Sequence, residues 1–166
     1  MNGQRANAEI TRIVENVVKN VEDQMQSRSV RAANELSGAV KQVLSGERSG
    51  RRYRAPETYR RQRDKATGRM RKGVYYTASA PGEPPANRTG DFRLSFNQTK
   101  AFAERMGRVV HYHSQTGSSY RVKGGRLLGE MLENGTRRML PRPYMQPTID
   151  RAMPNIIRIY SAPYIR

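Results

Sequence analysis

The sequence predicts an α+β fold in which a long N-terminal helix and a C-terminal helix flank a small antiparallel sheet, with a long basic loop. Three observations predict it. Apolar residues recur at helical spacing over residues 9–44, Arg and Lys crowd residues 47–72, and short β-branched and aromatic runs bounded by turn residues follow. The 166 residues suit a single domain made of a helix (1–46), a basic loop or arm (47–72) and a sheet with a terminal helix (73–166).

Composition predicts a polyanionic neighbour. Lys and Arg number 31 against 14 for Asp and Glu, so the formal net charge is +17, a self-repulsion that a compact monomer tolerates poorly. Apolar residues make up only 36% of the chain, below the ~45–50% usual for globular chains. We therefore expect a thin core in the monomer, for which assembly with other subunits is the natural remedy.

Several protein classes are excluded. The chain has no cysteine, so it has no disulfide framework, no thiolate zinc site and no Cys nucleophile. Uncharged stretches reach only about a dozen residues, whereas a membrane-spanning helix needs ~20 mostly apolar ones. We expect no transmembrane segment and no membrane partner. Residues 1–11 lack the apolar core of a secretory signal, so we expect the protein to work or assemble in a cytoplasm.

One long amphipathic helix is predicted from Glu9 to Leu44. Thirty-six residues would span roughly 54 Å, longer than a small domain is wide, and Gly46 stands where a helix would end. Two interpretations stay open: a helix that covers its own sheet, and one that also packs on neighbouring subunits. A two-stranded coiled coil is disfavoured because Arg28 and Ser29 interrupt the stripe, whose apolar members are Ile10, Val14, Val17, Val21, Met25, Ala32, Leu36, Ala39 and Val43.

Positive charge is concentrated in residues 47–72, where eleven basic and three acidic residues leave +8. Apolar residues are scarce, which predicts a long loop or partly disordered arm. Tyr53 and Tyr59 interleave with arginines, a combination that suits phosphates and stacked bases. A solvated loop without a ligand and a loop docked on an acidic protein are the alternatives. The predicted contacts with DNA or an acidic partner are Arg48, Arg51, Arg52, Arg54, Arg60, Arg61, Arg63, Lys65, Arg69, Arg71 and Lys72.

The remainder predicts a small antiparallel sheet. Val74–Ala78 and Arg108–His113 have strand composition. Ala80–Pro85 contains three prolines and is expected to be a rigid linker. Gln115–Ser119 is interpreted as a hairpin connection into Tyr120–Val122.

A terminal helix is predicted after Pro143. Pro143 at its start and Pro147 in its first turn are tolerable, whereas Pro154 is expected to kink or split it. The helical spacing is carried by Ile149, Met153, Ile156, Ile157 and Tyr160.

No catalytic constellation is recognisable. His111 and His113 alternate along a predicted strand and share one face, but two ligands do not make a metal site and no third His or any Cys exists. The acidic residues show no acid–base spacing, and Gly124-Gly125-Arg126 lacks the lysine of a phosphate-cradling loop. We therefore predict no catalytic residue, metal or cofactor, and no enzyme, although a nuclease with scattered acidic ligands stays open.

Two strings resemble a known family. Residues 80–96, APGEPPANRTGDFRLSF, look like the "APG.PP…TG.LR.S" segment of the tail-completion, or neck, proteins of long-tailed bacteriophages. Residues 130–147, EMLENGTRRMLPRPYMQP, are similar to that family's "LE.GT..M..RP.L.P" signature. With the flanking elements the resemblance covers roughly residues 9–160. The matching positions, which we interpret as architectural, are Pro81, Gly82, Pro84, Pro85, Thr89, Gly90, Leu94, Glu133, Gly135, Thr136, Arg142, Pro143 and Pro147.

The residue types at several of these positions also have a physical explanation that does not depend on the family. Gly90 and Gly135 each follow or precede a Thr and are expected to be turns in which the hydroxyl bonds to backbone. Arg142 lies between two prolines, extended, and is expected to pair with Glu133 or Glu130. The chain departs from the family in its longer, more Arg-rich 47–72 stretch, whose role is therefore not carried over, and in having Leu127-Leu128-Gly129 where an aromatic often stands.

The resemblance implies a structural virion protein of the phage neck. Such a protein would form a homo-oligomeric ring, expected to be hexameric, that joins the tail terminator to the head-closure (stopper) or portal complex around the DNA channel. It would contact viral DNA independently of sequence and reside at the head–tail interface of the virion after assembly in the host cytoplasm. A stand-alone basic nucleic-acid-binding protein, monomeric or dimeric, is the alternative that the charge supports equally well.

Overall fold

The computed structural model describes residues 2–54, 75–97, 99–107, 109–122 and 124–164. It confirms the predicted α+β class. A long N-terminal helix and a C-terminal helix accompany two small antiparallel two-stranded sheets. The elements are α1 (Asn2–Ser45), β1 (Arg52–Arg54), β2 (Tyr75–Thr77), α2 (Asp91–Leu94), β3 (Lys100–Met106), β4 (Val109–Gln115), α3 (Leu128–Asn134) and α4 (Met145–Ser161).

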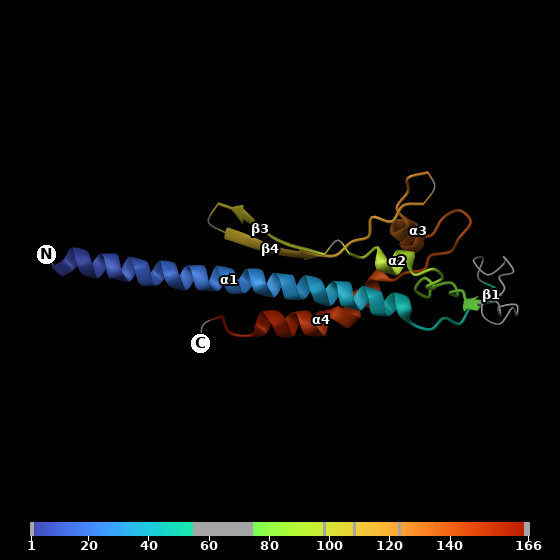
Figure 1. Ribbon diagram of the computed structural model, residues 1–166, viewed down its shortest axis with the longest axis horizontal. Coiled ribbons are helices and arrows are strands. Elements are labelled where there is room, and N and C mark those ends of the chain that lie inside the picture. The colour runs from blue at the N-terminus through green and yellow to red at the C-terminus, as the bar shows by residue number, and fades with distance from the viewer. Residues whose placement is uncertain (1, 55–74, 98, 108, 123, 165–166) are drawn as a thin grey trace, which may run out of the picture.

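Helix α1 has 44 residues, about 66 Å at 1.5 Å per residue, and runs along the length of the molecule (Figure 1). It ends as predicted beside Gly46, whose N–H donates to the Val43 carbonyl oxygen (3.4 Å). Only its second half is covered by the rest of the chain. Every residue from 5 to 20 is exposed, and this N-terminal half, which we call the arm, projects past the other elements (Figure 1).

Helix α4 lies along the second half of α1 (Figure 1). Small residues let the two helices approach closely, since Ala32 and Ala39 of α1 and Ala152 of α4 are all buried. Of the two outcomes expected at Pro154, a kink or a split, the split is wrong, because α4 is continuous from Met145 to Ser161. Pro154 is on the exposed side of α4, where water can satisfy the carbonyl that loses its donor.

Arg28 and Ser29 interrupt the apolar stripe of α1 because they bond to neighbouring elements. Both are buried. The Ser29 hydroxyl donates to the His113 carbonyl oxygen of β4 (2.9 Å). Arg28 donates to the carbonyl oxygens of Ala162 (2.5 Å) and Pro163 (2.7 Å), just beyond the end of α4. These two polar residues therefore dock the hairpin and α4 on α1.

Both predicted strands are present, but they lie in two separate sheets. Strand β4 includes residues 109–113 of the predicted Arg108–His113 segment and pairs with β3, from Lys100↔Gln115 to Met106↔Val109. The predicted hairpin from Gln115–Ser119 into Tyr120–Val122 is wrong. Tyr120–Val122 instead leads into a tight turn. The Val122 N–H donates to the Arg126 carbonyl oxygen (3.0 Å), and the two glycines between them, Gly124 and Gly125, have positive φ. Glycine supplies this turn without strain, so the chain reverses there.

Strand β2 falls inside the predicted Val74–Ala78 strand. Its partner is β1, which belongs to the segment predicted to be a loop, and the register is Arg52↔Thr77, Tyr53↔Tyr76 and Arg54↔Tyr75. The linker 80–85 has no regular helix or strand, as predicted.

The core is small and lies where α2, α3 and the start of α4 meet the end of α1. Its buried members are Val40, Leu44, Phe96, Leu132 and Tyr144. The rings of Phe96 and Tyr144 meet edge to face, with centroids 5.9 Å apart. The core therefore includes residues from the C-terminal half of α1 and none from the arm.

Candidate functional site

The two segments that carry the family resemblance pack against each other. The Gly82 N–H of the first donates to the Pro141 carbonyl oxygen of the second (3.2 Å). The Phe92 ring meets the Tyr144 ring edge to face, with centroids 5.6 Å apart. Strings that are separate in sequence therefore form one structural unit, at the end of the molecule away from the arm.

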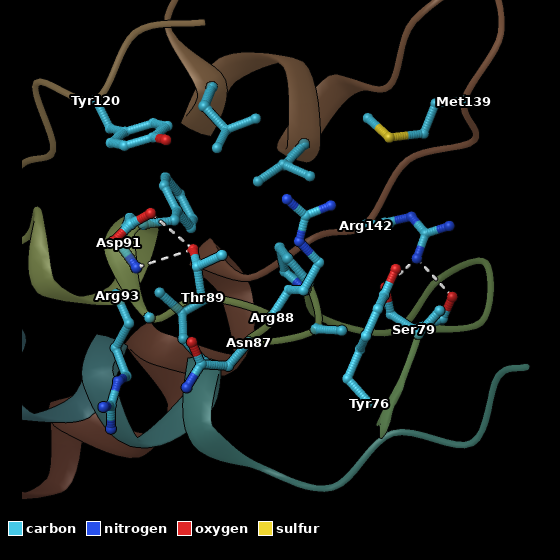
Figure 2. Close-up of a pocket in the computed structure, with 18 residues that line it drawn as sticks. Tyr76, Ser79, Asn87, Arg88, Thr89, Asp91, Arg93, Tyr120, Met139 and Arg142 are labelled. Carbon is cyan, nitrogen blue, oxygen red and sulfur yellow. Dashed lines mark hydrogen bonds between the residues drawn. The ribbon is translucent and has the colours of Figure 1, made fainter. Parts of the chain in front are cut away.

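A pocket of about 430 Å³ opens within this unit (Figure 2). Asp91, the only carboxylate among the described residues that line it, accepts a hydrogen bond from the Thr89 hydroxyl (2.8 Å). Arg93 donates to the Ser45 hydroxyl oxygen (2.9 Å). Asp91 and an Arg93 guanidinium nitrogen are thus engaged in hydrogen bonds within the chain. The lining is Leu44, Tyr76, Ala78, Ser79, residues 85–93, Tyr120, Leu128, Leu132, Met139 and Arg142.

Arg142 does not pair with Glu133 or Glu130, so that expectation is wrong. Its guanidinium donates to the carbonyl and hydroxyl oxygens of Ser79 (Figure 2), and its backbone N–H donates to the Leu132 carbonyl oxygen (2.7 Å). The side chain points toward Ser79, the residue before the linker (Figure 2). Arg142 consequently joins the second segment to the residue that precedes the first.

Glu133 instead caps α4. Its carboxylate accepts the backbone N–H groups of Tyr144 (2.9 Å) and Met145 (3.2 Å). The free N–H groups at a helix start attract a carboxylate by hydrogen bonding and by the helix dipole. At α4 these N–H groups, and not the Arg142 guanidinium, are the partners of Glu133. Burial raises the pKa of Tyr144, and the nearby Glu133 charge adds to that rise.

The two motif glycines that neighbour a Thr lie in turns, as predicted. Gly90 has φ 90° and Gly135 has φ 76°, a region that side-chain-bearing residues avoid. The hydroxyls of Thr89 and Thr136 each accept the backbone N–H two residues further on, at 3.4 and 3.3 Å. A Cβ on Gly135 would also lie 2.8 Å from the Met139 carbonyl oxygen.

Glu83 holds the proline-rich linker against the chain that follows α1. Its carboxylate accepts the Ser49 hydroxyl (2.5 Å), the Ser49 N–H (3.2 Å) and the Ala80 N–H (2.9 Å). These hydrogen bonds, the one from the Ser49 hydroxyl first, lower the pKa of Glu83. Nothing in the family strings marks this residue, because its partner Ser49 is far away in sequence.

Arg48 belongs to the same junction. Its guanidinium donates to the carbonyl oxygens of Val43 (2.6 Å) and Pro85 (3.1 Å). Burial lowers the pKa of Arg48, while the nearby charge of Glu83 acts to raise it. This arginine, predicted as a DNA or partner contact, has a structural set of partners in the monomer.

The other motif positions surround the pocket or the start of α4. Pro81 and Pro84 lie in the linker, with Gly82 at φ 81° between them. Pro143 immediately precedes Tyr144, the residue before α4, and Pro147 lies in the first turn of that helix. Leu94 of α2 is 63% exposed, so it does not contribute to the core.

The β1–β2 pair, which we call the Arg–Tyr ribbon (residues 51–54 and 75–77), exposes alternating cations and rings. The Arg52 guanidinium lies 4.9 Å from the Tyr75 ring centroid, and that of Arg51 lies 5.7 Å from Tyr53. Tyr53 also stacks on Tyr76, with centroids 5.9 Å apart. Such a surface can pair with phosphates and stack on bases.

The ribbon includes the predicted contacts Arg51, Arg52 and Arg54. The remaining predicted contacts lie outside the described residues: Arg60, Arg61, Arg63, Lys65, Arg69, Arg71 and Lys72. The sequence showed the alternation of Arg with Tyr53 but not the contribution of Tyr75 and Tyr76, which pairing brings beside it.

His111 and His113 share one face of β4, with ring centroids 6.3 Å apart. His113 stacks on Phe102 (4.9 Å), and its Nε2 lies 3.7 Å from a Glu104 carboxylate oxygen. Among the described residues no group of three or more His, Cys, Asp or Glu is placed to hold a metal ion. In the same part of the chain, every helix is too short or too polar to cross a membrane.

Comparisons with known proteins found no matching family model, no matching curated protein and no matching solved structure.

Proposed function

We propose that this chain is a structural subunit of a phage neck, which assembles into a ring between the tail terminator and the head-closure or portal complex. The observation that carries the proposal is the arm. Ile10, Val14 and Val17 are 59%, 54% and 41% exposed, although they form the apolar stripe of an amphipathic helix. A chain that leaves such a stripe uncovered is an incomplete unit, as a ring subunit would be.

The resemblance to neck proteins is the reason for proposing that the chain lies at the head–tail junction. Its two segments are brought together by hydrogen bonds and ring contacts rather than scattered over the surface, which supports treating them as one architectural motif. The side chains of Asp91, Arg142 and Glu133 bond within the chain. This arrangement favours a scaffold over a reactive centre.

Charge indicates which partners a ring would need. Six copies of a +17 chain would carry 6 × 17 = 102 formal positive charges. Duplex DNA has one phosphate per ~1.7 Å, so a passage about 50 Å long exposes only ~30 negative charges. The ring would therefore meet acidic protein surfaces as well as DNA. The Arg–Tyr ribbon, at the end of the molecule opposite the arm (Figure 1), is the proposed DNA-facing part, together with the basic residues of the 47–72 stretch that lie outside the described residues.

Labelling of virions tests the proposal. Antibodies against this chain, carried on gold particles, are added to virions from the phage genome that encodes it and imaged by electron microscopy. Label at the head–tail junction supports the proposed function. Label elsewhere, or none on intact and tail-detached particles, overturns it.

The Arg–Tyr ribbon favours one second candidate, a stand-alone nucleic-acid-binding protein. That function predicts a monomer or dimer with tight binding in bulk solution, whereas a neck subunit predicts rings and modest, sequence-independent affinity. Native mass spectrometry combined with a DNA titration separates the two.

A further inference from the structure

The arm presents one broad apolar face. At 100° per residue its Ile and Val side chains fall within an arc of ~140°, with the charged residues on the other side. From Ile10 to Val21 the face is about 17 Å long at 1.5 Å per residue. Ile13 and Val18 widen it and are 56% and 51% exposed. A face this broad fits against a wide apolar surface better than against the narrow a/d interface of a two-stranded coiled coil.

Helix α4 carries a second exposed apolar stripe. Met145, Ile149, Met153 and Ile157 follow one another at four-residue steps and are 54%, 39%, 44% and 60% exposed. The stripe is about 18 Å long, which matches the length of the arm face. Met145 and Ile149 also form one wall of a groove of about 410 Å³ whose lining includes Val40 of α1.

The arm cannot reach the α4 stripe of its own chain. Asn155 bonds to Glu35 (3.2 Å) and Arg151 bonds to Gln42 (2.5 Å), so the α4 stripe lies beside the second half of α1. Val17 precedes Glu35 by 18 positions in one continuous helix, about 27 Å along its axis. Any arm that covers this stripe must come from another copy.

The charge of the arm is compatible with docking on another copy. Residues 5–20 contain three basic and two acidic side chains, so the arm carries only +1 of the chain's +17. A nearly neutral segment meets little repulsion from the basic body of a second copy and gains little from DNA phosphates. A membrane-surface helix has a polar face rich in Lys and Arg, which this balanced face does not provide.

We infer that the arm of each subunit docks on the α4 stripe of the next copy of this chain, covering Met153 and its neighbours. The donor and acceptor surfaces differ, so the contact is head-to-tail, and repeated contacts of this kind generate a ring when the rotation closes. This inference rests on the proposed ring and identifies the surfaces that build it.

Cysteine cross-linking tests the contact in the full chain, which has no native cysteine. Val17→Cys and Met153→Cys are made separately and together, with Val14→Cys and Ile149→Cys to sample the neighbouring registers. These side chains are exposed or nearly so, hence the fold should tolerate the changes. A disulfide needs Cα atoms within ~7 Å, so Val17 and Met153 of the same chain cannot join.

Head-to-tail docking predicts a mixed disulfide dimer when the Val17→Cys and Met153→Cys proteins are combined and oxidised. The double variant should give a ladder of covalent multimers on a non-reducing gel, while each single variant alone stays monomeric. Lys19→Cys, on the opposite face of the arm, is the matched control and should cross-link to Met153→Cys at least tenfold less.

Two results overturn the inference. Dimers from Val17→Cys alone would show arm-to-arm pairing, and the absence of mixed disulfides in every register at millimolar concentration would show that no such contact forms. A ladder without virion neck labelling would uphold the docking and refute the proposed function. Neck labelling without a ladder would do the reverse.

Discussion

The guanidinium of Arg28 lies 3.6 Å from the centroid of the Tyr164 ring. The same guanidinium donates to carbonyl oxygens that follow α4. One buried cation of α1 thus satisfies the carbonyl groups left free where α4 ends and holds the aromatic ring that follows. The contact holds the segment after α4 against α1.

Loss of this cation should destabilise the fold. Arg28→Met keeps the length of the side chain but leaves the carbonyl oxygens of Ala162 and Pro163 without their donor. We expect a loss of about 2–4 kcal/mol in the free energy of unfolding, measured by urea denaturation. Arg31→Met, at an exposed position one turn on, is the control and should change it by less than ~0.5 kcal/mol. Equal losses would contradict the role of Arg28.

Gly135→Ala should be costly because of its backbone. The added Cβ would meet the Met139 carbonyl oxygen at 2.8 Å while φ stays at 76°. We expect a loss of about 1–3 kcal/mol, seen as a lower Tm. Gly117→Ala is the matched control, since no atom lies within 4 Å of its Cβ position and its φ is not positive. A Tm equally lowered in both variants would argue against strain at Gly135.

The Glu83 junction should make stability depend on acid pH. The pKa of Glu83 is lowered in the folded chain, chiefly by the Ser49 hydroxyl. Its contribution is therefore complete above the unfolded value of about 4.3 and is lost as pH falls through the lower folded pKa. Glu83→Gln should flatten the fall of unfolding free energy with decreasing pH in this range. Glu47→Gln, at an exposed neighbouring position, should leave the profile unchanged, and an unaltered profile for Glu83→Gln would refute the link.

The basic surface should bind duplex DNA through phosphates. Replacing Arg51, Arg52, Arg60 and Arg61 by Ser should weaken binding of any duplex sequence and reduce the slope of log affinity against log salt by about 1 per lost phosphate contact. Fluorescence anisotropy across a salt series measures both. Arg12→Ser on the arm is the charge control, for which we expect little change. Unchanged affinity in the fourfold variant would remove DNA from the proposed partners of this surface.

Local chemistry along the sequence determined a large part of this molecule. The periodicity of α1, the spacing of α4, the proline-rich linker and the turns at Gly90 and Gly135 each depend on residues close together in the chain. Helical periodicity, the lack of a backbone N–H in proline and the positive φ of glycine each depend on a few neighbouring residues. They can therefore be recognised in the sequence before the tertiary contacts are known. The excess of arginine in residues 47–72 is likewise visible without a fold.

Only the tertiary structure decided which elements pair and which polar groups meet. Strand β3 (KAFAERM) consists mostly of residues that favour helix, and it is a strand because it pairs with β4 and packs on α1. Arg142 bonds to Ser79 rather than Glu133 because the start of α4 occupies that carboxylate. Such contacts join residues far apart in the chain, so their energies depend on three-dimensional proximity, which local propensity does not encode.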